Sequence, residues 1–165
     1  MASNMSWTLE IKSPVAAPRL FRRAIMDWYT QPHKISPDIL ASSHLVEGEG
    51  GIGSVTQYNY SSAIPVSAMK ERLDFLDADK CEGKWAIMEG AGDGTLFEMA
   101  TSNIKVEPAA NGGSVVKAEM TYKDLPGVGV KDDMPKHKEM IITIFKAAEA
   151  YLIANPDAYN QAVYN

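Results

Sequence analysis

Apolar and polar residues alternate with a period of two along much of this chain. Residues 7–12 alternate in this way and predict a β-strand. Apolar residues then recur at steps of three and four, which predicts a short helix over about residues 17–28. Pro32 and Pro37 bracket a second short helical turn or loop. Alternating segments separated by turn residues predict further strands near 39–46, 53–60, 67–77, 83–89, 95–106 and 113–123.

The C-terminal third has a different pattern. From Met134 to Leu152 apolar residues recur at steps of three and four, which predicts a long amphipathic helix that Asn155 and Pro156 end. We therefore predict an α+β fold, in which this helix covers one face of a single antiparallel sheet. The helix face is rich in Met and Ile, which suits either an adaptable cavity wall or a solid core.

Composition is typical of one globular domain spanning residues 1–165. Hydrophobic residues make up 45% of the chain and charged residues 22%. A net charge of −5 argues against a nucleic-acid partner, since such proteins usually carry a basic face. The single cysteine, Cys81, fits a reducing compartment. Because the sequence shows neither a signal peptide nor an apolar run of about 20 residues, we expect a cytoplasmic protein without a membrane partner.

The histidines do not indicate a metal site. His33, His44 and His137 are scattered and lack the spacing of metal ligands, so solvent-facing or capping roles are expected. We predict no metal and no cofactor.

A glycine-rich stretch, Glu47–Ser54, is the most distinctive local motif. Such loops can cradle phosphate with their backbone N–H groups. Here no lysine follows the last glycine, and the next segment is β-rich, so the loop is expected to join two strands. The residues singled out in it are Glu47, Gly48, Gly50, Gly51 and Gly53.

Several motifs in order give the chain a family resemblance. They are Glu47–Gly53, Lys70–Asp74, Glu89–Glu98, Asn111–Lys117 and Tyr151–Asn160. Together they resemble the intracellular class-ten pathogenesis-related proteins of plants, the family of the major birch pollen allergen. The resemblance covers nearly the whole chain.

This resemblance implies a helix-grip fold. Seven antiparallel strands would wrap around the long C-terminal helix, with two short helices and an internal cavity of about 300 Å³ or more. It also implies a plant defence or stress protein that binds apolar or amphipathic small molecules, such as hormones, flavonoids or sterols, in that cavity. We expect a monomer, with weak dimerisation as the alternative. The expected cavity residues are Ala24, Ile25, Tyr60, Val66, Trp85, Ile104, Val115, Met140, Ile141, Ile144 and Phe145.

Enzymatic activity is the alternative. Lys117 aligns with the cavity lysine of norcoclaurine synthase, and a buried lysine with a lowered pKa could form an iminium. Glu98, Glu149 and Tyr151 match residues proposed for a weak ribonuclease activity in the family, but Thr56 replaces the lysine of that set. Glu98 stands at the position that matches the tyrosine of the synthase, so the residue sets of both activities are incomplete in this chain.

Hormone sensing is a third hypothesis. Ser62–Val66, followed by Glu71–Asp74, is similar to the gate loop of abscisic acid receptors, which share this fold. The latch of those receptors has no counterpart in Gly83–Ile87, so docking of a phosphatase is not expected.

Overall fold

The computed structural model of the chain describes residues 4–64, 67–89, 97–124 and 134–159. The strands are β1 (Asn4–Ser13), β2 (Leu40–Glu47), β3 (Val55–Tyr60), β4 (Ala68–Asp77), β5 (Glu82–Glu89), β6 (Phe97–Pro108) and β7 (Ser114–Asp124). The helices are α1 (Ala17–Phe21), the π-helical segment η1 (Arg22–Met26), α2 (Asp27–Thr30), the 3-10 turn η2 (Pro32–Lys34) and α3 (Met134–Ala154).

The strands form one antiparallel sheet. Its order is β1-β7-β6-β5-β4-β3-β2, so β2 to β7 form a meander. β1 pairs with β7 and is one edge strand of the sheet, and β2 is the other. In that last pairing Ile11 lies opposite Val116. The predicted α+β, helix-grip architecture is confirmed, with seven strands, the long C-terminal helix and the two short helices α1 and α2. The helix expected over residues 17–28 is these two helices with η1 between them.

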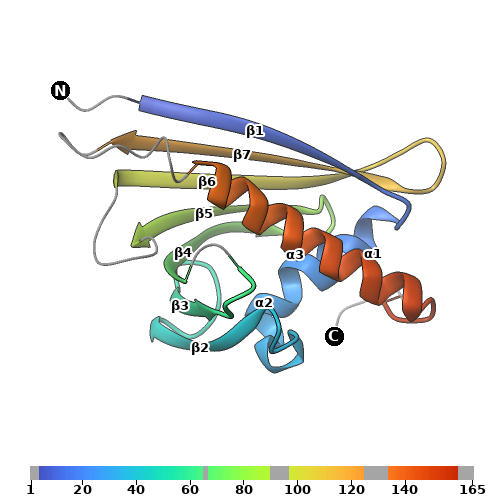
Figure 1. The fold of residues 1–165 in the computed structure, drawn as a ribbon, viewed down its shortest axis with the longest axis horizontal. Helices are drawn as coiled ribbons and strands as arrows, with labels where there is room; N and C mark the ends of the chain where they lie inside the picture. Colours follow the sequence, from blue (N-terminus) through green and yellow to red (C-terminus); the bar gives the residue numbers. More distant parts are fainter. Residues whose placement is uncertain (1–3, 65–66, 90–96, 125–133, 160–165) are drawn as a thin grey trace.

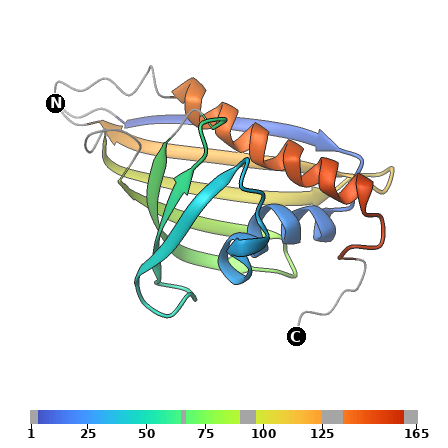
Figure 2. The same cartoon turned by 60° about the horizontal axis from the view of Figure 1, so that its bottom comes forward.

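The sheet curves around α3, which crosses its concave side with α1 and α2 beneath it (Figures 1 and 2). Register shifts between β2 and β3, β4 and β5, and β6 and β7 mark β-bulges or similar irregularities. Bulges increase the local twist and bend a strand, so they help to close the sheet around the helix.

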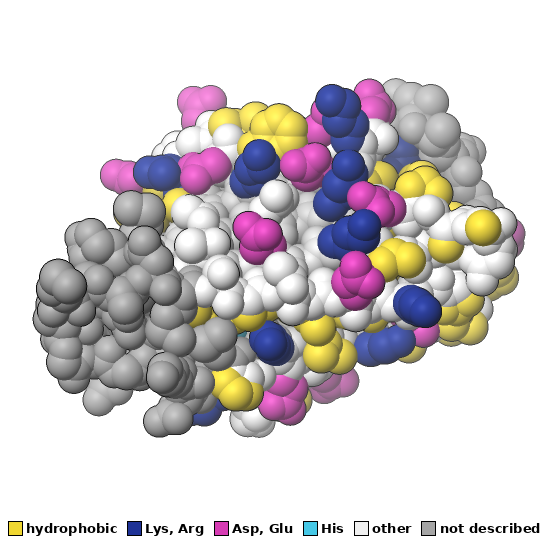
Figure 3. All heavy atoms as spheres, turned by 90° about the horizontal axis from the view of Figure 1, so that it is seen from above, with side chains coloured by type: hydrophobic (Ala, Val, Ile, Leu, Met, Phe, Trp, Pro, Cys, Tyr) yellow, Lys and Arg dark blue, Asp and Glu magenta, His cyan; other side chains and the backbone are white. Residues whose placement is uncertain are grey.

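Alternation along each strand decides which side chains reach the core. On β7, Val116, Ala118, Met120 and Tyr122 are buried, whereas the residues between them face outward. From the opposite side α3 contributes Met140, Ile141, Phe145, Ala148 and Leu152 to the same core. On the side of β1 and β7, acidic and basic side chains are interspersed and do not gather into a basic face (Figure 3).

The end of α3 is fastened to the first helical segment by Arg19. Its guanidinium donates hydrogen bonds to the backbone oxygens of Leu152 (3.2 Å), Asn155 (3.1 Å) and Ala158 (2.9 Å). A cation is favourable here because the last carbonyls of a helix lack partners and carry partial negative charge.

A buried carboxylate holds the segment that follows α3. Asp27 is fully buried in α2 and accepts hydrogen bonds from Arg23, at 3.2 Å, and from the hydroxyl of Tyr159. Arg19, Arg23 and Asp27 therefore hold the end of α3 and the residues after it against the segment from α1 to α2.

The glycine-rich stretch joins β2 to β3, as predicted. The backbone φ angles of Gly48, Gly50 and Gly53 are +85°, +101° and +90°, values that residues other than glycine rarely adopt. The N–H of Gly50 donates to Ser54 Oγ (2.7 Å), and the N–H of Gly53 donates to the carbonyl of Leu73 on β4 (2.7 Å). Two of the N–H groups of the loop therefore already donate hydrogen bonds within the protein.

No helix in the described ranges combines the length and the apolar character that a membrane crossing needs.

A substitution of Gly48 tests the loop geometry. A Cβ there would lie 2.6 Å from Ser54 Oγ and 2.9 Å from Ser54 Cα, in a left-handed conformation. Gly48→Ala should therefore lower the free energy of unfolding by about 2 kcal/mol or more, measured by urea denaturation. Gly51→Ala is the matched control, since its Cβ would meet nothing within 4 Å. Equal losses in the two variants would contradict this account.

Candidate functional site

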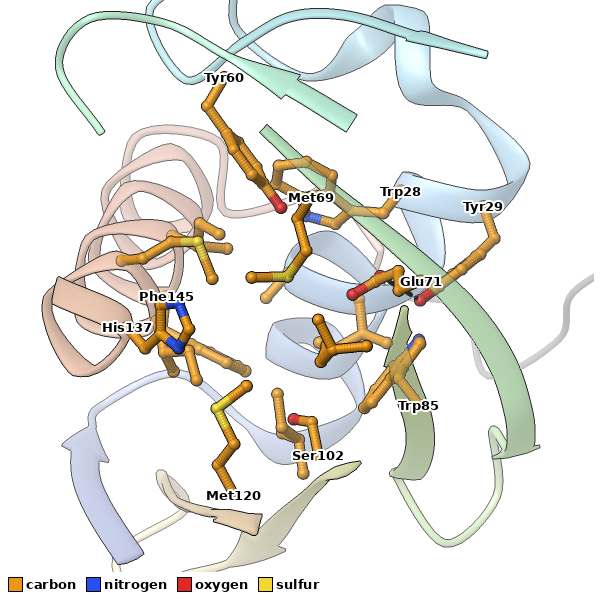
Figure 4. A pocket seen from close by; sticks show the side chains of 17 residues that line it. Trp28, Tyr29, Tyr60, Met69, Glu71, Trp85, Ser102, Met120, His137 and Phe145 are labelled. Atoms are coloured by element: carbon orange, nitrogen blue, oxygen red, sulfur yellow. Dashed lines mark hydrogen bonds between the residues drawn. The ribbon is translucent and has the colours of Figure 1, made fainter. Parts of the chain in front are cut away.

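A cavity lies between the inner face of the sheet, α3 and the helical segment of α1, η1 and α2 (Figure 4). It contains about 640 Å³ of space between atoms, its opening to solvent included, of which the centre of a water molecule can occupy about 80 Å³. The lining residues are Ala24, Ile25, Trp28, Tyr29, Tyr60, Met69, Glu71, Trp85, Ile87, Ser102, Ile104, Met120, His137, Met140, Ile141, Ile144 and Phe145.

The volume that a ligand could occupy without movement of side chains is therefore smaller than the expected value of about 300 Å³. The total space is larger than this figure, but the part that water can reach is much smaller. Met69, Met120 and Met140 project into the cavity from β4, β7 and α3. Unbranched thioether side chains change rotamer easily, so these walls can move to admit a larger ligand.

Most of the predicted cavity residues line this space. Val66 lies outside the described residues. The nine predicted residues named next all line the cavity, and their role in ligand binding stays a prediction. They are Ala24, Ile25, Tyr60, Trp85, Ile104, Met140, Ile141, Ile144 and Phe145.

Val115 and Lys117 do not face the cavity, which corrects two expectations. Both lie on β7 in the outward register, one residue away from the buried Val116 and Ala118. A shift of one residue moves a side chain to the other face of a sheet. Lys117 Nζ lies 2.9 Å from the Glu107 carboxylate on the outer surface. The hydrogen bond to Glu107 raises the pKa of Lys117, whereas iminium chemistry needs a lowered one.

The ribonuclease candidates do not form a site in the described residues. The side chain of Glu98 lies outside them. Glu149 is 3.3 Å from Lys146 on α3, and Tyr151 packs under the guanidinium of Arg23, 3.8 Å from the ring centroid. Neither residue lines the cavity.

Sequence reasoning missed the polar part of the wall. Glu71 occurs in a charged stretch typical of a surface strand, but the apolar Met69 and Leu73 on either side place it on their own inner face. His137 was assigned to solvent or to a helix cap, yet it is buried in α3 with an exposed fraction of 2%. Its place in the helical repeat with Met140 and Ile141 was the available signal. The other wall residues missed are Trp28, Tyr29, Met69, Ile87, Ser102 and Met120.

Glu71 is the one carboxylate among the lining residues in the described part of the chain. The hydroxyl of Tyr29 donates a hydrogen bond to Glu71 Oε1 (3.1 Å), drawn as a dashed line in Figure 4. Burial disfavours the charged form and raises the pKa of Glu71 to about 7, against the opposing effect of the Tyr29 hydrogen bond. Burial and the nearby Glu71 also raise the pKa values of Tyr29 and Tyr60, so both remain neutral hydroxyls.

Trp85 closes the wall beside Glu71. Its ring stacks on Tyr29, with centroids 6.2 Å apart and planes at 15°. A Cβ at Gly83 would lie 2.5 Å from the Trp85 ring, so glycine at this position gives the indole its room. The buried indole N–H has no acceptor among the described residues, which leaves one hydrogen-bond donor available at the cavity.

Comparison with known proteins identifies this architecture. The model of the pathogenesis-related protein Bet v 1 family matches residues 2–155. The chain belongs to this family. Pathogenesis-related protein 1 of Asparagus officinalis, a relative in the same family, is 47% identical over 158 residues, which are 95% of this chain and 99% of that protein.

Other Bet v 1 family relatives and solved structures agree. The probable intracellular pathogenesis-related protein T1 of Catharanthus roseus is 32% identical over 93% of this chain and 98% of its own. The crystal structure of Ara h 8.0201 superposes with a TM-score of 0.74 at 26% identity, over 93% of this chain and 100% of that one. Norcoclaurine synthase from Thalictrum flavum, with dopamine and hydroxybenzaldehyde, gives a TM-score of 0.71 at 17% identity, over 95% and 90% of the chains. At that identity the likeness shows the fold alone.

The raised pKa of Glu71 predicts a pH dependence of stability. The folded protein holds this proton more tightly than the unfolded chain, whose carboxyl keeps a value near 4.5. The folded state therefore loses stability as the pH rises from about 4.5 to about 7, and the loss is complete above this range. Glu71→Gln should relieve it and gain roughly 1–3 kcal/mol over the parent at pH 8, but little at pH 4.

Urea denaturation of both proteins at the two pH values measures this difference. Glu119→Gln, on the exposed outer face of β7, is the control and should show no such gain. An equal effect of Glu71→Gln at both pH values would contradict a raised pKa.

Proposed function

We propose that this protein binds an amphipathic small molecule in its internal cavity, as a defence-related or stress-related protein of the plant cytoplasm. The observation that carries the proposal is the cavity wall, which is mostly apolar and aromatic with a few polar groups directed inward. Such a wall provides hydrophobic affinity over most of a ligand and orientation at one end.

The arrangement of the polar groups supports one mode of binding. Glu71, Tyr29 and Trp85 lie together on one side of the cavity, and Ser102 and His137 lie elsewhere on the wall (Figure 4). Apolar side chains of α3 such as Ile141, Ile144 and Phe145 form the rest. A ligand with an apolar body and one polar end fits this division better than a uniformly polar or uniformly apolar one.

The comparisons support the biological setting of the proposal. The relatives from asparagus and Catharanthus carry the name pathogenesis-related, and the second is called intracellular. A binding role also agrees with the position of Lys117, since the lysine required by the condensing-enzyme alternative lies on the outer face of β7.

A cavity-filling substitution tests the proposal. Ser102 lies on β6 with its side chain inward, so Ser102→Phe should fill part of the cavity and weaken binding of the neutral probe N-phenyl-1-naphthylamine by about tenfold or more. Probe fluorescence measures the binding, and circular dichroism confirms that the variant is folded. The neighbouring Thr101→Phe is the matched control, because Thr101 faces outward on the same strand. Binding that is equally strong in both variants would place the probe outside the cavity.

A further inference from the structure

The Glu71 side of the cavity combines a carboxylate with a set of aromatic rings. Tyr29 from α2 and Trp85 from β5 stack on each other with centroids 6.2 Å apart, and Tyr29 also holds Glu71 Oε1 by its hydrogen bond. Trp28 from α2 contacts Tyr60 from β3 with ring centroids 6.1 Å apart. Four aromatic rings from three elements therefore line the cavity together with this one acidic group.

Among the described residues that line the cavity, none supplies a fixed positive charge to balance this carboxylate. None of the residues that line the cavity in the described ranges is lysine or arginine. The titratable groups that face Glu71 are the neutral hydroxyls of Tyr29 on α2 and of Tyr58 and Tyr60 on β3, with His137 on α3 across the cavity. A partly buried carboxylate that has a hydrogen bond but no cation beside it is unfavourable, so the site gains most from a ligand that supplies a positive charge.

We propose that Glu71 and the rings of Trp28, Tyr29, Tyr60 and Trp85 form an ammonium subsite. It takes the protonated amine of a ligand whose apolar body lies against α3. The inference rests on the proposed function, because it concerns one end of the same cavity. The amine donates to the Glu71 oxygen that Tyr29 leaves free, and the ring faces attract its positive charge.

The same arrangement excludes other ligand charges. A ligand carboxylate placed beside Glu71 would set two like charges in a site of low dielectric constant, which is strongly unfavourable. A neutral alcohol can accept or donate a hydrogen bond there but does not neutralise the carboxylate. The order of affinity at pH 8 should therefore be amine, then alcohol, then acid.

Three probes with the same aromatic body test this order. They are 2-(2-naphthyl)ethylamine, 2-(2-naphthyl)ethanol and 2-naphthylacetic acid, each titrated into the full chain by calorimetry at pH 8. The amine should bind about tenfold more tightly than the alcohol, since a charge-assisted hydrogen bond is roughly twice as strong as a neutral one. The acid should bind more weakly than the alcohol.

Glu71→Gln separates charge from shape. It keeps the size of the side chain and removes its charge, so the ratio of amine affinity to alcohol affinity should fall from about ten to about one. Glu119→Gln on the outer face of β7 is the control and should keep the full preference. In the parent protein the amine should bind less tightly at pH 6 than at pH 8, because protonation of Glu71 removes the negative charge. Because His137 also lines the cavity, the pH profile of Glu71→Gln shows how much of the change in amine affinity does not depend on Glu71.

The outcomes distinguish the two proposals. If neither the alcohol nor the amine binds, the proposed function fails and the subsite fails with it. If the alcohol binds but the amine binds no tighter, the cavity is a ligand site and the ammonium subsite is wrong. Retention of the amine preference by Glu71→Gln would also overturn the subsite.

Discussion

The whole structure depends on covering one apolar face of a single curved sheet. Every strand turns its buried side chains to the same concave side, and a sheet of this kind is stable only when another element removes that face from water. In the described chain α3 and the segment from α1 to α2 perform this task. Arg19 and Asp27 then fix the C-terminal end of α3 and the residues after it to that segment.

The cover does not fill the space beneath it, and the wall of that space includes a group that a solid core would avoid. Glu71 is held inward by the pleat of β4, next to Tyr29, where its charged form is disfavoured. A carboxyl in such surroundings reduces the stability of the folded chain at neutral pH. Retaining an unfavourable group at a cavity is typical of a site that interacts with something beyond the protein.

The hydrophobic periodicity and the family resemblance together predicted the fold well, but they predicted only part of the cavity wall. The strands and the long helix follow from periodicity, because each buries one face. Val115 was placed inward although the buried Val116, Ala118 and Met120 define the opposite register. Glu71 and His137 were missed because a charged or polar residue on an inward position is read as surface when its neighbours are not considered. The position of the Trp85 ring depends on the space that Gly83 leaves, which sequence periodicity does not describe.

The pairing of β1 with β7 has a consequence for the synthesis of the protein. Ile11 and Val116 are neighbours in the sheet, yet most of the chain lies between them. During translation β1 is synthesised before the other described elements, and its apolar side chains stay uncovered until β7 has been made. The helix α3 is synthesised after β7. Non-local pairing of this kind slows folding and exposes apolar surface on the nascent chain. The sheet can therefore be completed only after β7 has been synthesised, and its apolar face is covered only once α3 has followed.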